Sequence, residues 1–138
     1  MRKILFLLIV SIVIVSCESE LGNFEKVKID GKDISGWWAY VECDGDIFYD
    51  DVDKIIEIDG DALTHYESNG YPIKDGYLIG CTINDWKPYM TQLVTFKNNR
   101  ICSSLFYAGY IFSVKGDKLY IDNEDEGLEV YQKVKGFK

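Results

Sequence analysis

Histidine, arginine and proline are scarce in this sequence of 138 residues. His65 is the single histidine, and beyond residue 16 Arg100 is the single arginine. A zinc site needs several nitrogen or sulfur ligands, and a serine triad needs a histidine beside an exposed serine. The G-x-S-x-G, H-E-x-x-H and phosphate-binding glycine motifs are also missing. We therefore expect no catalytic residue, no metal and no cofactor, and we interpret His65 as a strand residue that faces solvent or a neighbour.

Negative charge outweighs positive charge. The formal net charge is −8, and it becomes −10 without the first 16 residues, because Arg2 and Lys3 leave with them. Nucleic-acid binding needs clustered cations that neutralise phosphates, so the sequence predicts no nucleic-acid partner. Two acidic segments, 44–53 and 122–127, lack the regular oxygen ligands of a calcium loop. We interpret both as solvated loops, with calcium binding as the alternative.

The first long apolar run stands at the start of the chain. Met1-Arg2-Lys3 is followed by 13 uncharged and mostly apolar residues, 4–16. A short basic region before such a run is the pattern of a secretory signal. A transmembrane helix needs about 17 to 25 residues, so a signal anchor is the weaker interpretation.

Ile14-Val15-Ser16-Cys17 ends this run and resembles the lipobox of bacterial lipoproteins. The resemblance implies cleavage before Cys17 and acylation of that residue, and two or three acyl chains anchor a protein stably where one does not. A chance cysteine is the alternative. We therefore expect a signal peptide at residues 1–16, the lipidated cysteine and a tether at 17–33, and one domain at 34–138. This protein would be anchored in the bacterial cell envelope, with the outer membrane expected and its periplasmic or surface side left open.

The remaining sequence shows no sustained helical periodicity, has two prolines, and is dominated by β-branched and aromatic residues. Short runs of such residues alternate with Gly, Asp and Asn, which predicts an all-β sandwich or barrel. Asp59-Gly60-Asp61 and Gly116-Asp117 are strong hairpin signals. The predicted strands are 34–43, 52–58, 62–68, 76–83, 91–97, 100–107, 110–115, 118–122 and 128–134. Because successive strands are close together, we expect a small antiparallel meander barrel of eight or nine strands.

Alternation within the strands predicts which side chains face the interior, because successive side chains point to opposite faces. The predicted inward pairs are Ile56 with Ile58, Val94 with Phe96, Ile111 with Ser113, and Leu128 with Val130. Segments 77–83 and 104–112 are apolar on both faces. Either a second surface covers them, or the outside of the barrel is unusually aromatic.

Three cysteines follow Cys17, namely Cys43, Cys81 and Cys102. An oxidising compartment would permit one disulfide among them. Their spacing resembles no metal-binding motif, and cysteine suits buried strand positions as a small apolar residue. We therefore expect three thiols in strands, with a pairing of Cys43 to Cys81 or Cys102 left open.

Gly36-Trp37-Trp38 opens the first predicted strand and matches the G-x-W motif of lipocalins. Residues 34–134 resemble the short lipocalin-like domains of Bacteroidetes lipoproteins in this start, in the strand meander and in the last hairpin. The resemblance implies a lipocalin-like barrel in which Gly36 and Trp38 close one end, beneath an arginine of the last strand. That strand has no arginine here, so Lys133 or Lys135 would take its place. The lipocalin loop motif with Asp-Tyr after a threonine is missing too.

Aromatic residues exceed what one small core needs. Such rings stack on apolar ligands, sugars or partner proteins, although tyrosine and tryptophan also simply fit strands. The predicted ligand-binding residues are Trp86, Tyr89, Tyr107 and Tyr110. Segment 84–90, which contains the first two, is predicted as a loop across the barrel mouth.

The sequence leaves two functions open, and neither is enzymatic. In the first, the barrel holds a small apolar or amphiphilic ligand. In the second, a solid barrel docks an envelope protein or a glycan through its outer aromatic residues. A barrel of eight strands permits either. Small residues near one end would indicate a cavity, and Gly80, Ala108 and Gly109 hint at such space.

Overall fold

The computed structural model describes residues 24–29, 31–97, 100–103, 106–123 and 127–138. Cys17, the predicted site of lipid attachment, lies outside the described residues, as do the side chains of Tyr107, Ala108 and Gly109. Within the described ranges, no helix has both the length and the apolar composition needed to cross a membrane.

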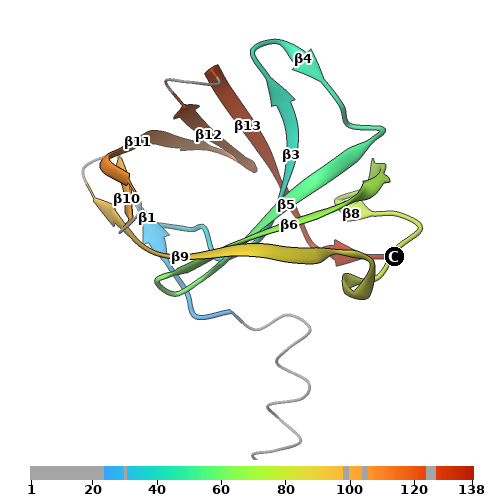
Figure 1. Ribbon diagram of the computed structural model, residues 1–138, viewed down its shortest axis with the longest axis horizontal. Helices are drawn as coiled ribbons and strands as arrows, with labels where there is room; N and C mark the ends of the chain where they lie inside the picture. The colour runs from blue at the N-terminus through green and yellow to red at the C-terminus, as the bar shows by residue number, and fades with distance from the viewer. Residues whose placement is uncertain (1–23, 30, 98–99, 104–105, 124–126) are drawn as a thin grey trace, which may run out of the picture.

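The described residues are all-β, and their main sheet has nine antiparallel strands, eight of which close a ring (Figure 1). The eight strands that close the ring are β3 (Gly36–Cys43), β5 (Val52–Asp59), β6 (Ala62–Tyr71), β9 (Lys87–Lys97), β10 (Arg100–Ser103), β11 (Phe106–Lys115), β12 (Lys118–Asn123) and β13 (Gly127–Val134). Each pairs with the next in this order, and β13 returns to pair with β3. The ninth strand, β4 (Asp46–Ile47), extends β3 as a short hairpin. The predicted all-β, sequential and antiparallel arrangement is confirmed.

Two of the ring's hairpins turn where the sequence predicts them. β5 pairs with β6 around Gly60, and β11 pairs with β12 around Gly116. The φ angles of these glycines are +59° and +61°. Backbone of this left-handed kind favours glycine, because a Cβ atom would crowd the following carbonyl.

Segment 76–83, predicted as a strand of the barrel, lies outside the ring, so that prediction is wrong. It contributes only β8 (Tyr77–Leu78), which pairs with β7 (Ile73–Lys74) and, in parallel, with β14 (Gly136–Phe137). Figure 1 shows β8 beside the C-terminal end of the chain. The 3-10 helix η1 (Ile83–Asp85) follows, and β9 begins at Lys87. The predicted mouth loop, 84–90, is therefore a helical turn followed by ring strand.

Two hydrophobic cores lie on the two faces of the ring's wall. β3 separates them by alternation, since Trp38 belongs to the inner core whereas Trp37 and Ala39 belong to the outer core. The inner core consists of Ile34, Trp38, Ile56, Ile58, Leu63, Val94, Ile101, Phe112, Leu119, Ile121 and Tyr131. The outer core consists of Trp37, Ala39, Val41, Val52, Ile55, Leu78, Cys81, Trp86, Val130 and Val134. Of the two explanations for segment 77–83, the covered second surface is the correct one.

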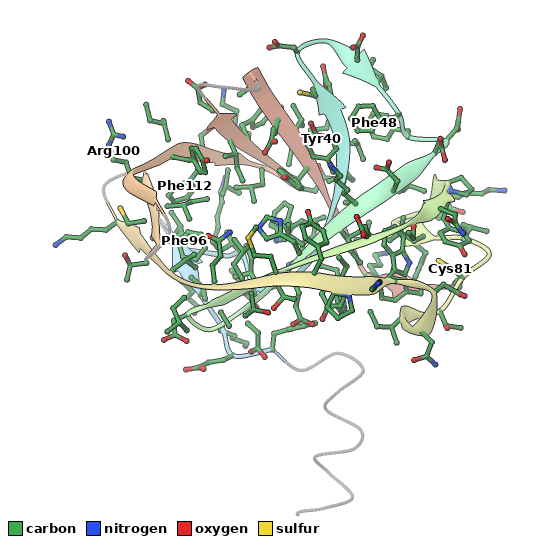
Figure 2. All side chains as sticks on the ribbon, in the orientation of Figure 1. Tyr40, Phe48, Cys81, Phe96, Arg100 and Phe112 are labelled. Carbon is green, nitrogen blue, oxygen red and sulfur yellow. The ribbon has the colours of Figure 1, made fainter. Side chains whose placement is uncertain are left out.

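Half of the predicted inward pairs are confirmed. Ile56, Ile58 and Val94 belong to the inner core, and Phe96 packs against it. Figure 2 shows Phe96 and Phe112 pointing into the ring, whereas Arg100 points away from it. The prediction for Ile111 and Ser113 is wrong, because both are exposed on the outer side of β11. The larger Phe112 between them is 3% exposed and takes the inward position.

The prediction for Leu128 and Val130 is also reversed. Leu128 is 43% exposed, Val130 lies in the outer core, and Tyr131 lies in the inner core. A shift of one residue moves every side chain of a strand to the other face. β13 carries apolar residues on both faces because both are covered, and its pairing with β3 shifts register between Val130 and Tyr131.

The described part of the predicted tether packs against one end of the ring. β1 (Lys28–Ile29) and β2 (Lys32–Asp33) form a short hairpin, and Val27 and Ile29 pack against the inner core. The amide of Ile34 donates to the carbonyl of Val27 at 2.8 Å, and the amide of Gly60 donates to that of Glu25 at 2.9 Å. These residues therefore cover the ring at this end.

No disulfide joins the three described cysteines. Cys81 is buried, and Cys43 and Cys102 are half-buried on β3 and β10. The expected location in a strand is confirmed for Cys43 and Cys102, whereas Cys81 lies in the connection after β8. Burial raises the pKa of the Cys81 thiol, which keeps it protonated at neutral pH.

Candidate ligand-binding site

A cavity of about 260 Å³ lies inside the ring. Its apolar wall is formed by Ile56, Leu63, Val94, Ile101 and Ile121, and it is also bordered by Ile55, which belongs to the outer core. The other lining residues are Tyr40, Lys54, His65, Tyr89, Met90, Gln92, Tyr110, Glu129 and Tyr131. Each of the eight ring strands contributes at least one of these side chains. The volume lies just below the range of roughly 300–1,000 Å³ that is usual for ligand pockets, so it suits a small molecule.

The end of the ring next to the N-terminal hairpin is closed by a tryptophan beneath a lysine. Trp38 is 2% exposed, and its indole N–H donates to the carbonyl of Ile34 at 2.9 Å. The ammonium of Lys133 lies 5.0 Å from the centroid of the Trp38 ring, within the range of a cation–π interaction. It also donates to the backbone carbonyl of Ser35. Burial lowers the pKa of Lys133, and the nearby Asp33 opposes that shift.

Gly36 brings the two strands together at this closed end. Its φ angle is +112°, and a Cβ atom there would lie 2.9 Å from the Lys133 ammonium. Glycine therefore provides both the backbone conformation and the space for the lysine. Of the two lysines expected near Trp38, Lys133 takes that position, whereas Lys135 lies over the ring of Tyr77.

His65 and Gln92 form a polar pair in the wall of the cavity. The His65 Nε2 and Gln92 Nε2 atoms are 3.2 Å apart, and Gln92 is 5% exposed. Burial lowers the pKa of the His65 imidazole to about 4, and the positive charge of Lys54 acts in the same direction. The ring is therefore neutral at pH 7. Because an amide nitrogen donates, His65 Nε2 accepts this hydrogen bond and the ring proton resides on Nδ1.

A second polar pair comes from β13. The Tyr131 hydroxyl donates to the Glu129 carboxylate at 3.1 Å, and Tyr131 is 5% exposed. Burial, followed by the charge of Glu129, raises the pKa of Tyr131 well above its usual value, so the phenol stays protonated. The Tyr40 ring packs edge-on against Tyr131 at 5.2 Å and stacks on Phe48 at 5.0 Å.

The predicted ligand-binding residues divide between the cavity and other parts of the chain. Tyr89 and Tyr110 line the cavity, and the side chain of Tyr107 lies outside the described residues. Trp86 lies in the outer core, where its indole N–H points to the Cys81 sulfur at 3.5 Å. η1 turns the chain just before β9, which directs Trp86 to the outer core. Gly80, expected to provide space near one end, is exposed in the connection after β8.

Six polar or aromatic residues of the wall were not predicted from the sequence as ligand-binding residues, namely Tyr40, Lys54, His65, Gln92, Glu129 and Tyr131. Tyr40 stands two positions after Trp38, and His65 stands two positions after Leu63 on the same inward face. Gln92 likewise precedes Val94 by two positions. This period of two was the available signal, but a polar residue within a predicted strand is more simply read as outward-facing. Tyr131 was missed because its strand was assigned the opposite face.

Among the described residues, no group of three or more His, Cys, Asp or Glu side chains lies close enough together to hold a metal ion. The cavity instead offers both apolar side chains and hydrogen-bonding groups. No family model, curated protein or solved structure matches this chain. Any assignment of function must therefore be argued from the cavity and the sequence.

Proposed function

We propose that this protein is a lipid-anchored lipoprotein of the bacterial cell envelope whose lipocalin-like barrel binds a small apolar or amphiphilic ligand. The observation that carries the proposal is the cavity of about 260 Å³ inside the ring. A barrel that served only as a solid scaffold would fill this space with side chains, because protein interiors are normally close-packed. The unfilled interior therefore favours the ligand carrier over the solid adaptor.

The closed end supports the lipocalin-like part of the proposal. Trp38 covered by Lys133 is the arrangement that the resemblance implies, with lysine in place of arginine. One end covered and a cavity inside is also a suitable arrangement for holding a ligand. The lipid anchor itself rests on the sequence around Cys17.

The cavity can be tested with a small neutral amphiphile. We expect one equivalent of 3-phenylpropan-1-ol to bind saturably to residues 18–138, measured by isothermal titration calorimetry. This chain keeps every described residue, and both cores form within it. Native mass spectrometry of the same preparation would reveal any ligand that copurifies.

A matched pair of substitutions locates the binding. Val94→Phe places a ring in the cavity, since Val94 is 3% exposed and lines it, whereas Leu93→Phe lies on the outer face, where Leu93 is 64% exposed. We expect Val94→Phe to weaken binding by about tenfold or more, which corresponds to about 1.4 kcal/mol, and Leu93→Phe to leave it unchanged. Absence of saturable binding to the unsubstituted chain would refute the proposal, as would equal binding by both variants when thermal melts show both to be folded.

A further inference from the structure

The charged groups of the cavity are not placed symmetrically. The described lining residues include one carboxylic acid, Glu129, and two basic residues, Lys54 and His65, and the pKa of His65 is lowered to about 4. Glu129 is half-buried, whereas Lys54 is exposed. A charge is more effective where water is partly excluded. A ligand inside the cavity therefore meets the carboxylate more strongly than the ammonium.

Aromatic residues line the same cavity as this carboxylate. Four lining residues are tyrosines, namely Tyr40, Tyr89, Tyr110 and Tyr131. The Tyr131 hydroxyl holds Glu129 at 3.1 Å, and the Tyr40 ring contacts Tyr131 at 5.2 Å. The face of an aromatic ring attracts a cation that lies within about 6 Å of its centre. Carboxylate and rings together form the kind of site that holds an ammonium group.

The wall is also prepared for this role before a ligand arrives. Phe48 stacks on Tyr40 at 5.0 Å with the two planes 21° apart, which fixes one ring of the site. Tyr89 lies against His65, with the ring centres 5.7 Å apart. Since His65 is neutral, its imidazole adds no positive charge that would repel a cation. Side chains held in this way need little ordering on binding.

The charge of the whole molecule acts in the same direction. The net charge is −8 at pH 7. A field of this sign concentrates cations near the surface and repels anions. The basic residue Lys54 also lines the cavity, and its flexible and exposed side chain can keep its ammonium in water.

We infer that the ligand of this cavity is a small organic cation, with its ammonium group beside Glu129 and the tyrosines and its apolar body against Ile56, Val94 and Ile121. This inference rests on the proposed function, and it names the class of ligand. An apolar cavity of about 150 Å³ holds benzene, so the larger volume here, about 260 Å³, accommodates one ring with a short chain. An anionic amphiphile of the same size would place its carboxylate against that of Glu129.

Three ligands of nearly equal shape test the inference. They are 3-phenylpropylammonium, 3-phenylpropan-1-ol and 3-phenylpropanoate, titrated into residues 18–138 at pH 7 and low salt. We expect the ammonium to bind about tenfold more tightly than the alcohol, as a charged hydrogen-bonded partner does, and the carboxylate to bind most weakly. The preference for the ammonium should also decrease at high salt.

Substitutions assign the preference to named groups. Glu129→Gln keeps the acceptor for Tyr131 and removes the charge, so it should lower ammonium affinity about tenfold while alcohol affinity stays within about twofold. Tyr89→Leu should weaken ammonium binding more than Tyr89→Phe, because phenylalanine keeps the aromatic ring. Tyr89 is 47% exposed, so both substitutions should leave the fold intact. Lys54→Met should leave ammonium affinity unchanged or raise it.

The outcomes separate this inference from the proposed function. Alcohol binding without a preference for the ammonium would overturn the inference and keep the carrier. Tightest binding of the carboxylate, lost in Lys54→Met, would do the same and assign an anionic ligand. If none of the three ligands binds, both proposals fail.

Discussion

Acidification should destabilise this protein through His65. The imidazole is half-buried in the wall of the cavity, where Gln92 donates to it and where its pKa is about 4 instead of 6.5. Loss of hydration is the main cause, and the charge of Lys54 adds to it. The folded protein thus favours the neutral ring, whereas the unfolded chain takes up a proton near pH 6.5.

The sign and size follow from this difference. Above pH 6.5 the ring is neutral in both states, so the contribution of His65 to stability is fully present. As the pH falls from 6.5 towards 4, the unfolded chain binds the proton first and the free energy of unfolding decreases. This lowering of the His65 pKa corresponds to about 3 kcal/mol of unfolding free energy in total, of which about 2 kcal/mol is lost by pH 5.

The assay is urea unfolding followed by tryptophan fluorescence between pH 7.5 and 4.5. His65→Gln is the matched control, because glutamine accepts from Gln92 and does not titrate. Carboxyl groups, including Glu57, whose pKa is raised by burial, titrate in both proteins and cancel in the comparison. We expect the unsubstituted protein to lose about 2 kcal/mol more than the variant between pH 7 and pH 5.

A direct measurement can refute the reasoning. His65 is the single histidine, so one imidazole signal in the NMR spectrum reports its protonation. If that signal titrates near pH 6.5 in the folded protein, or if both proteins lose stability equally on acidification, the imidazole is not held in its neutral form by burial.

The closed end and the outer core give three further predictions. Lys133→Met should cost about 1–2 kcal/mol of unfolding free energy, because the Trp38 ring and the Ser35 carbonyl lose their cation. The control is Lys135→Met, since the Lys135 side chain is exposed and its ammonium lies 5.8 Å from the centroid of the Tyr77 ring. An equal cost for this variant in urea titrations would contradict the prediction. Gly36→Ala should cost about 1–3 kcal/mol because its φ is +112°, and an unchanged melting temperature would refute that reason. Trp86→Phe should lower the free energy of unfolding by roughly 1–3 kcal/mol but leave the affinity for 3-phenylpropan-1-ol unchanged. If calorimetry shows a loss of affinity as large as that of Val94→Phe, Trp86 belongs to the binding site.

The turns and the strongly alternating strands were the predictable part of the fold. Asp59-Gly60-Asp61 and Gly116-Asp117 are local signals, because a left-handed glycine specifies a tight turn without help from distant residues. Ile56 with Ile58 and Val94 with Phe96 are unambiguous because their strands carry few apolar residues at the alternate positions. These features suffice for an antiparallel meander.

The prediction that segment 76–83 is a strand of the ring was wrong because its sequence pattern is ambiguous. Its apolar residues suit a strand of the ring as well as they suit a packed connection, and periodicity does not distinguish the two. What decides is the outer core, where Leu78 and Cys81 pack with Trp37 from β3 and Val134 from β13. That contact joins parts of the chain that are far apart in sequence, so no local pattern contains it.

The outer core also explains why the polar wall of the cavity could not be predicted. Because it covers one side of β13, that strand is apolar at Val130 and Val134 on the outside and carries Glu129 on the inside. Alternation alone then assigns the faces the wrong way round. The same arrangement lets the protein keep a polar, unfilled interior, since apolar burial lost inside the ring is offset by burial on its outer face. The wall of β3, β5 and β13 is thus held from outside, so polar residues within the ring are free to be selected for what they bind.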